Sequence, residues 1–238
     1  MGVIELLACA FAFWDSRPTK RKFQQQGKKV NSALWASLKE PTTWVMSLVG
    51  FFYMGAEVTV GGWLPTFLLS SRGATEFGAG MALVGFWLGV IFGTLLLAFA
   101  VAKLGERPSV FFFLAVALGL QLIFWLVPNF FAATIATALT GFWMGPVFPT
   151  AIVLAVKLLP EYLHVTSIGV ISTVGCTGST VFPFIFAVLA EKTGVRHLPA
   201  FVFGIMCILM GLWLLPLKKK LEDEIIPRRA SVKEVSMA

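Results

Sequence analysis

The chain has 238 residues, of which 58% are hydrophobic and 13% are charged, and its formal net charge at pH 7 is +7. A soluble core of this length cannot bury so much apolar surface, whereas lipid can, so the composition excludes an ordinary soluble domain. The positive charge does not indicate nucleic-acid binding, because the basic residues lie mainly in connectors between apolar segments, where they face anionic headgroups. The cysteines lack zinc-ligand spacing and no nucleophile–base set occurs, so we expect no metal, no cofactor and no enzyme.

Residues 1–14 are mostly apolar but too few to span a bilayer. They lack the basic start and the cleavage site of a secretory signal, so we interpret them as the remnant of a preceding transmembrane helix. Residues 15–40 are polar and basic and are predicted to be a cytoplasmic linker, with an interfacial amphipathic stretch from Ser32 to Leu38. The remnant and the linker together indicate the back half of a larger protein.

Six apolar segments, each about as long as a transmembrane helix needs to be, fill residues 41–217. They are Trp44–Ser70, Gly80–Ala102, Val110–Val127, Phe130–Val156, Val165–Ala190 and Ala200–Leu217. The connectors alternate between rich and poor in lysine and arginine, and the tail at 218–238 belongs to the rich set. Because basic residues favour the cytoplasmic side, we expect the linker and the tail to be cytoplasmic. The expected fold is an all-α membrane protein with a six-helix transmembrane bundle, in the plasma membrane or, as the alternative, an organelle membrane.

Two of these spans share an unusual composition. Gly55–Phe67 in the first span and Gly141–Thr150 in the fourth both combine glycine, tryptophan and an intramembrane proline, and both are predicted to be broken helices. Paired interrupted segments at corresponding positions indicate the binding site of a transporter. Since the two segments are three spans apart, the sequence predicts two inverted three-helix repeats.

Several segments resemble a known family in the same order. Residues 53–69, YMGAEVTVGGWLPTFLL, resemble the seventh helix of the fungal fucose-permease-like group of the major facilitator superfamily, Gly85–Leu97 resembles its eighth and Gly141–Thr150 its tenth. The resemblance covers residues 15–217 and implies the C-terminal half of a carrier that works by alternating access, often on sugars or other small polar solutes with protons. The chain departs from the group at Thr94, where Arg is common, and at Ala102, where an Asp of the cytoplasmic gate is usual.

Glu57 is the only acidic side chain deep within any predicted span. A charge in the hydrocarbon core costs roughly 2.5–3.5 kcal/mol on insertion scales, so this carboxylate must face a polar interior, bond a partner or be protonated. One interpretation is that Glu57 binds a solute hydroxyl or carries a proton. The other is structural, with Glu57 capping a broken helix at Gly61 and Gly62 or bonding a neighbouring helix. Tyr53, four residues earlier on the same face, can orient the carboxylate or simply pack in the core.

Aromatic and hydroxyl side chains supply further candidates for solute binding. Trp143, in the middle of the fourth span, is a candidate to stack against a sugar, although tryptophan also packs in cores. Thr173 and Thr177 share one helical face in the fifth span and are candidates to line a cavity. The alternative for both threonines is close helix packing with interhelical hydrogen bonds, and we favour that alternative.

Two other features predict packing. Gly85, Gly89 and Gly93 recur every four residues in the second span, which is typical of a small-residue packing face. Gln121, a polar side chain in the third span, is predicted to bond a neighbouring helix.

The predicted function is transmembrane transport of a small polar solute, a sugar or an organic acid, with protons as the candidate coupling ion. The predicted partners are the lipid bilayer, the solute, and either a missing N-terminal half or a second copy, because alternating access rocks two halves around a shared site. Three alternatives stay open: a truncated carrier, a half-carrier that dimerises, and a non-transporting membrane protein or relic that pairs with or regulates another carrier. The remnant at residues 1–14 favours the first.

Overall fold

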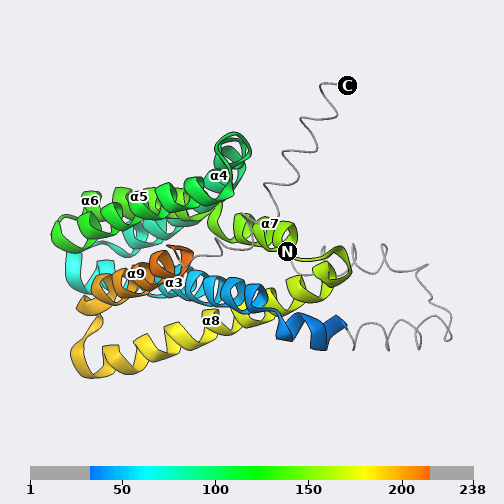
Figure 1. Cartoon of the computed structure of the whole chain (residues 1–238). Helices are drawn as coiled ribbons and strands as arrows, with labels where there is room; N and C mark the ends of the chain where they lie inside the picture. The colour runs from blue at the N-terminus through cyan, green and yellow to red at the C-terminus, as the bar shows by residue number, and fades with distance from the viewer. Residues whose placement is uncertain (1–32, 215–238) are drawn as a thin grey trace, which may run out of the picture.

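The structure is a computed structural model that describes residues 33–214, and this part of the chain is helical without any strand (Figure 1). The helices are α3 (Pro41–Arg72), α4 (Glu76–Leu104), α5 (Glu106–Leu126), α6 (Phe130–Met144), α7 (Val147–Leu158), α8 (His164–Thr193) and α9 (Leu198–Leu214). Single 3-10 turns, η1 (Glu161–Leu163) and η2 (Val195–His197), precede α8 and α9. Six helices in this range, with α6 and α7 counted as one, are long and apolar enough to cross a membrane, as predicted. The remnant at 1–14, residues 15–32 of the linker and the tail lie outside the described residues.

Local signals in the connectors set where the helices begin and end. Gly73 ends α3 in the left-handed conformation, with φ of 63°. Thr75 then caps α4, because its hydroxyl accepts the Gly78 N–H at 3.1 Å. Asn129 caps α6 in the same way and accepts two backbone N–H groups at 2.8 and 3.2 Å. These short capped turns keep successive spans antiparallel.

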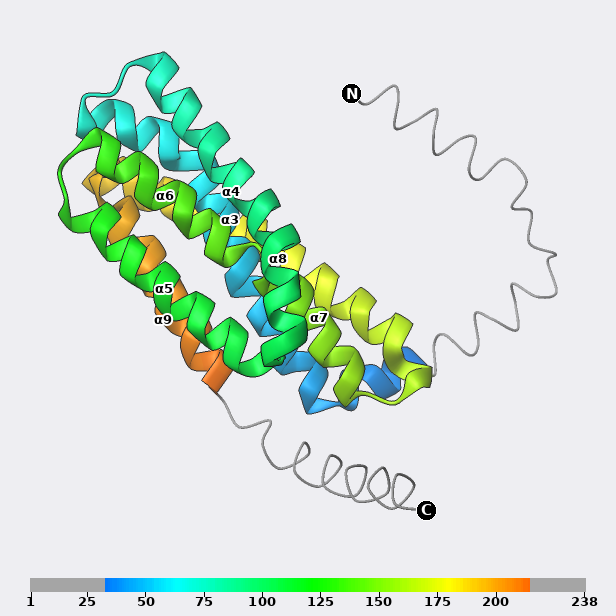
Figure 2. The ribbon, with the colours of Figure 1, turned by 90° about the horizontal axis from the view of Figure 1, so that it is seen from above.

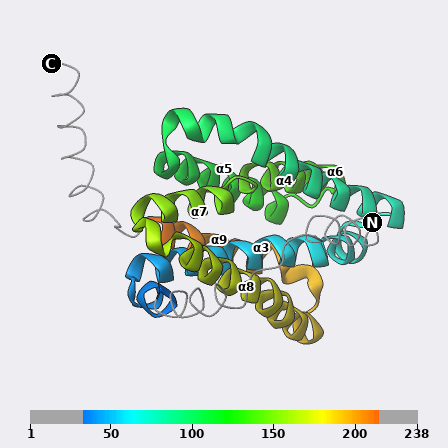
Figure 3. The same ribbon diagram turned by 90° about the vertical axis from the view of Figure 1, so that its right-hand side faces the viewer.

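The packing of the spans repeats itself. The first span, α3, packs mainly against α8 and α9, while the fourth span packs through α6 mainly against α4 and α5. Each three-helix repeat therefore supplies one central helix that packs on the second and third helices of the other repeat. Figure 3 shows α4, α5 and α6 on one side of the bundle and α3, α8 and α9 on the other, with α7 between them. This exchange is the arrangement expected of two inverted three-helix repeats.

Glycines set how closely the paired helices approach. A Cβ built on Gly89 or Gly93 of α4 would collide with the backbone of α6. In the matching α3–α8 pair, a Cβ on Gly178 would collide with the backbone carbonyl of Phe51. The predicted packing face on the second span is thus confirmed for Gly89 and Gly93. Gln121 also behaves as predicted, because its amide donates to the carbonyl of Pro199 in α9 at 3.2 Å.

The two spans that were predicted to be broken differ. The fourth span is interrupted at Gly145 and Pro146, where α6 ends and α7 begins. In contrast, α3 is one continuous helix of 32 residues through its glycine pair and Pro65, so the predicted break in the first span is wrong. A lone proline leaves only one carbonyl without its helical partner, whereas Pro146 and Pro149 remove two N–H donors within one turn.

Candidate functional site

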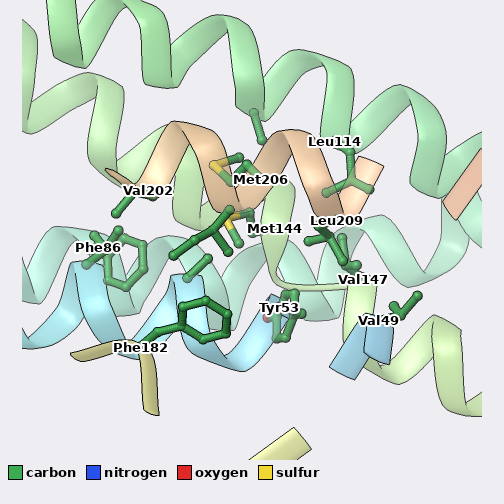
Figure 4. Close-up of a cluster of buried hydrophobic side chains, with 14 of the residues drawn as sticks. Val49, Tyr53, Phe86, Leu114, Met144, Val147, Phe182, Val202, Met206 and Leu209 are labelled. Carbon is green, nitrogen blue, oxygen red and sulfur yellow. The ribbon is translucent and has the colours of Figure 1, made fainter. Parts of the chain in front are cut away.

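A tyrosine–glutamate pair lies on one face of α3, inside the apolar part of the bundle. The side chain of Tyr53 is 3% exposed, and its ring stacks on that of Phe148 from α7 with centroids 5.9 Å apart. Figure 4 shows Tyr53 at the edge of the buried cluster that also contains Val147 and Leu209. The carboxylate of Glu57 lies one helical turn from the Tyr53 hydroxyl on the same face of α3, and its side chain is only half-buried. The structure therefore brings these two predicted residues together and leaves part of the glutamate accessible.

An indole from another helix lies one turn beyond this pair. A Cβ built on Gly61 of α3 would lie 2.7 Å from the ring of Trp87 in α4, so the absence of a side chain at Gly61 lets the indole rest on the helix. Gly61 follows Glu57 by four residues and shares its face. Trp87 is 40% exposed and meets the ring of Phe86 edge-on, with centroids 5.3 Å apart. A partly exposed ring one helical turn from a carboxylate is a combination that suits a sugar, which has apolar faces and a rim of hydroxyls.

Sequence reasoning missed Trp87. The ring is placed by a glycine on a different helix, and that pairing becomes visible only when the two spans are packed together. The one available signal was the glycine pair Gly61 and Gly62 one turn after the buried carboxylate. Glycine in such a position often marks the close approach of another group.

The structure does not place Trp143 beside the Tyr53–Glu57 pair. Its ring contacts Phe112 and Phe113 of α5, at centroid distances of 5.7 and 5.5 Å. These are the contacts of an aromatic packing cluster between α5 and α6. The stacking of Trp143 on a sugar therefore stays a prediction.

The two candidate threonines lie on an exposed face of α8. The hydroxyl of Thr173 donates to the Gly169 carbonyl at 2.8 Å, and that of Thr177 donates to the Thr173 carbonyl at 3.0 Å. Both donors are thus used within α8 itself, and each oxygen keeps lone pairs that can accept a bond. Cys176 and Thr180 are exposed on the same face. The centre of α8 therefore presents a small, polar surface away from the helices described here.

A cavity of about 240 Å³ lies where the broken fourth span approaches α4. Thr94 and Ala102 of α4 form one wall, and Pro146 and Thr150 form the opposite wall. Glu106, at the start of α5, lines the cavity and forms an ion pair with Lys157 near the end of α7. The two positions at which the chain departs from the group's usual Arg and Asp therefore face the same cavity, and Glu106 is the charged side chain on its wall.

The chemistry available at these places is binding and proton exchange. Within residues 33–214 no group of three or more His, Cys, Asp or Glu side chains could hold a metal ion. The Tyr53–Glu57 pair can accept hydrogen bonds from solute hydroxyls, and its carboxylate can take up or release a proton. Both properties suit a solute-binding site inside a membrane bundle.

Comparisons with known proteins agree with this architecture. The family profile described as "Major Facilitator Superfamily" matches residues 46–237. The protein named "Bypass of stop codon protein 6" from Saccharomyces cerevisiae is 28% identical over 204 residues, which cover 80% of this chain and 40% of the yeast protein. The chain therefore spans well under half the length of this curated relative.

Two solved structures share the fold. The transporter FucP, crystallised in its outward conformation, matches with a TM-score of 0.64 at 18% identity, over 76% of this chain and 45% of FucP. A variant of the E. coli fucose:proton symporter FucP matches with a TM-score of 0.65 at 17% identity, over 77% of this chain and 45% of the symporter. At these identities the likeness concerns the fold alone.

Proposed function

The chain belongs to the major facilitator superfamily, and on that premise we propose that it forms the C-terminal half of a carrier for a small polar solute, with a sugar first and an organic acid second. The observation that carries this proposal is the Tyr53–Glu57 pair, in which a half-buried carboxylate lies one turn from a buried hydroxyl within a membrane-spanning helix. A polar pair in that position is costly and is retained where a solute or a proton uses it. The fucose:proton symporter among the structural matches supports a sugar and a proton as the solute and the coupling ion.

Alternating access requires a second six-helix half, and the exposed surface of the bundle supports a proposal for its contact face. The peripheral helix α4 exposes large apolar side chains, among them Phe77, Leu88 and Ile91, which suit lipid. Its counterpart in the other repeat, α8, exposes Thr173 and Thr177 at its centre instead. We propose that this polar face of α8 contacts a companion half, either a separate six-helix unit or a second copy of this chain.

An alternative function is that of a non-transporting membrane protein that pairs with another carrier. The observation that favours it is the uncharged wall of the cavity at Thr94 and Ala102, where the group's usual gate charges are absent. Such a protein would keep the companion face of α8 but would not move a solute. Transport measurements therefore separate the two functions.

The experiment is uptake of a panel of radiolabelled hexoses and organic acids into liposomes that contain the purified chain. Uptake is expected only in preparations where a companion half is present. Oxidative crosslinking through Cys176, which is exposed on the companion face of α8, tests whether a second copy serves, and Cys207, exposed on α9, is the matched control. Crosslinked pairs that transport no member of the panel would support the non-transporting alternative. Uptake by demonstrably single chains would contradict the requirement for a companion.

The proposed orientation has its own test. We propose that the N-terminal end of α3 faces the cytoplasm of a plasma membrane, because the connectors at that end carry most of the basic residues. A cysteine introduced at Gly73, in the turn after α3, is expected to react with an impermeant thiol reagent in intact cells. A cysteine at Lys103, at the opposite end of α4, is expected to resist it, and the reverse pattern would overturn the orientation.

A further inference from the structure

Residues 33–39 form a short helical segment that is fastened to the end of the bundle where α3 and α8 begin (Figure 2). Ser37 is fully buried, and its hydroxyl oxygen lies 2.5 Å from that of Ser167 in α8. Thr43, in the first turn of α3, donates to the same Ser167 oxygen at 3.4 Å. Because these three buried hydroxyls bond one another, they hold the segment in a fixed orientation against both helices.

The opposite face of this segment is exposed and carries a tryptophan and a lysine. The side chain of Trp35 is 68% exposed, and Lys39 lies four residues later on the same face. Trp44, in the first turn of α3, is 47% exposed, and its indole N–H donates to the Leu38 carbonyl at 2.8 Å. Exposed indoles beside a lysine at the end of a membrane bundle are typical of side chains that lie at the lipid headgroups.

The chain directly before this segment is strongly basic. Residues 15–32 contain six lysines and arginines against one acidic residue, which gives a net charge of +5. These basic residues are Arg17, Lys20, Arg21, Lys22, Lys28 and Lys29, and Lys39 of the segment adds a seventh. Each such charge close to an anionic membrane surface contributes about 1 kcal/mol of attraction. A surface of lipid phosphates therefore complements both the charge of the linker and the hydrogen-bond donor of the exposed indole.

We propose that residues 33–39 dock onto anionic lipid headgroups of the cytoplasmic leaflet, with Trp35 and Lys39 at headgroup level. Only the assignment to the cytoplasmic leaflet depends on the orientation proposed above, and the lipid contact itself does not. Since Ser37 and Thr43 join the segment to both α3 and α8 through Ser167, the lipid contact fixes the position of these two helices relative to the membrane surface. The docked segment is therefore a lipid-sensitive support for the helix that carries Glu57.

The test places an aromatic fluorophore where the indole lies. Bimane is attached to Trp35→Cys in a chain whose native cysteines are replaced by serine, and the protein is placed in nanodiscs of phosphatidylcholine with or without phosphatidylserine. Quenching by acrylamide, a neutral aqueous quencher, is compared with quenching by lipids that carry a nitroxide near the headgroup. Bimane at Lys103→Cys, an exposed position at the same end of the bundle, is the control. Nanodiscs expose both faces, so the result does not depend on which face is cytoplasmic.

The expected result is that phosphatidylserine lowers acrylamide quenching at position 35 about fivefold or more and makes the nitroxide lipids effective, while the Lys103 control changes little. Combined replacement of Lys28, Lys29 and Lys39 by glutamine should restore acrylamide quenching. Equal aqueous quenching at both positions in both lipids would overturn the proposal. Protection of position 35 that is the same with and without phosphatidylserine would also overturn it, because it would mean that protein or neutral lipid covers the residue.

Discussion

The first and fourth spans occupy equivalent places in the two repeats, yet one is a continuous helix and the other is broken. α3 continues through Pro65 and carries the Tyr53–Glu57 pair, while the fourth span is interrupted at Gly145 and Pro146 and carries no acidic residue. The two helices therefore have different structural roles. The continuous helix supplies a rigid support for a polar site, and the broken one supplies a joint beside the cavity at α4.

The partners of the two helices explain why one break is tolerated. α6 packs on α4 and α5, whereas α7, beyond the break, packs on α3 and α8. The main neighbours of the fourth span thus change at the break, from α4 and α5 to α3 and α8. α3 packs mainly on α8 and α9 and also contacts α4 and α7, and it does so as one continuous helix.

The largest expected effect is on the joint itself. A Cβ added at Gly145 would collide with the Val90 carbonyl of α4, whereas one added at Gly62 of α3 meets nothing within 4 Å. We expect Gly145→Ala to destabilise the bundle by about 1–3 kcal/mol through overpacking. Gly62→Ala should be neutral or slightly stabilising. The stability of both variants is measured by thermal unfolding in detergent, with size-exclusion chromatography as the readout. Equal melting temperatures would show that the joint is not closely packed.

A second comparison removes the prolines. Pro146→Ala restores an N–H that can donate within the helix, so amide hydrogen exchange around residues 145–148 should slow by about fivefold to tenfold, the equivalent of one hydrogen bond. Pro65→Ala should change exchange in α3 far less, because that helix is already continuous. Uptake should fall in Pro146→Ala if the joint moves during transport. A similar slowing in both variants would mean that the break does not arise from the prolines of the fourth span.

A smaller effect is expected from the hydroxyl of Tyr53. Tyr53→Phe keeps the ring on Phe148 and removes only the hydroxyl near Glu57, so solute affinity should fall by about fivefold, or roughly 1 kcal/mol. The other tyrosine of the chain, Tyr162, is 71% exposed, and Tyr162→Phe is the matched control. Titration with the best solute of the uptake panel measures both affinities. A Tyr53→Phe affinity equal to that of the control would leave the tyrosine with a packing role alone.

The sequence predicted the spans well because their signal is local. Each span is a run of apolar residues of bilayer length, and the glycine spacing in the second span and the polar Gln121 in the third identified packing sites without knowledge of their partners. The four-residue spacing of Tyr53 and Glu57 likewise placed them on one face.

What the sequence did not predict depends on contacts between spans. Trp87 lies near the turn of Glu57 because Gly61 on another helix admits its ring, and Trp143 faces α5 because of how α6 is rotated. The continuity of α3 could not be predicted either, because proline and glycine permit a bend without requiring one. The decisive quantity in each case is the packing of the neighbouring helices.

Solute binding to Glu57 tests the central claim most directly. The affinity of the purified chain in nanodiscs for the panel of hexoses and organic acids is compared between Glu57→Gln and Glu76→Gln, which alters an exposed glutamate at the start of α4. If the Tyr53–Glu57 pair binds the solute, Glu57→Gln should weaken binding by about tenfold to a hundredfold, since a hydrogen bond to a charged group contributes roughly 1.5–3 kcal/mol. Glu76→Gln should bind as the original chain does. Equal affinities in the two variants, at equal folded yield, would contradict the account.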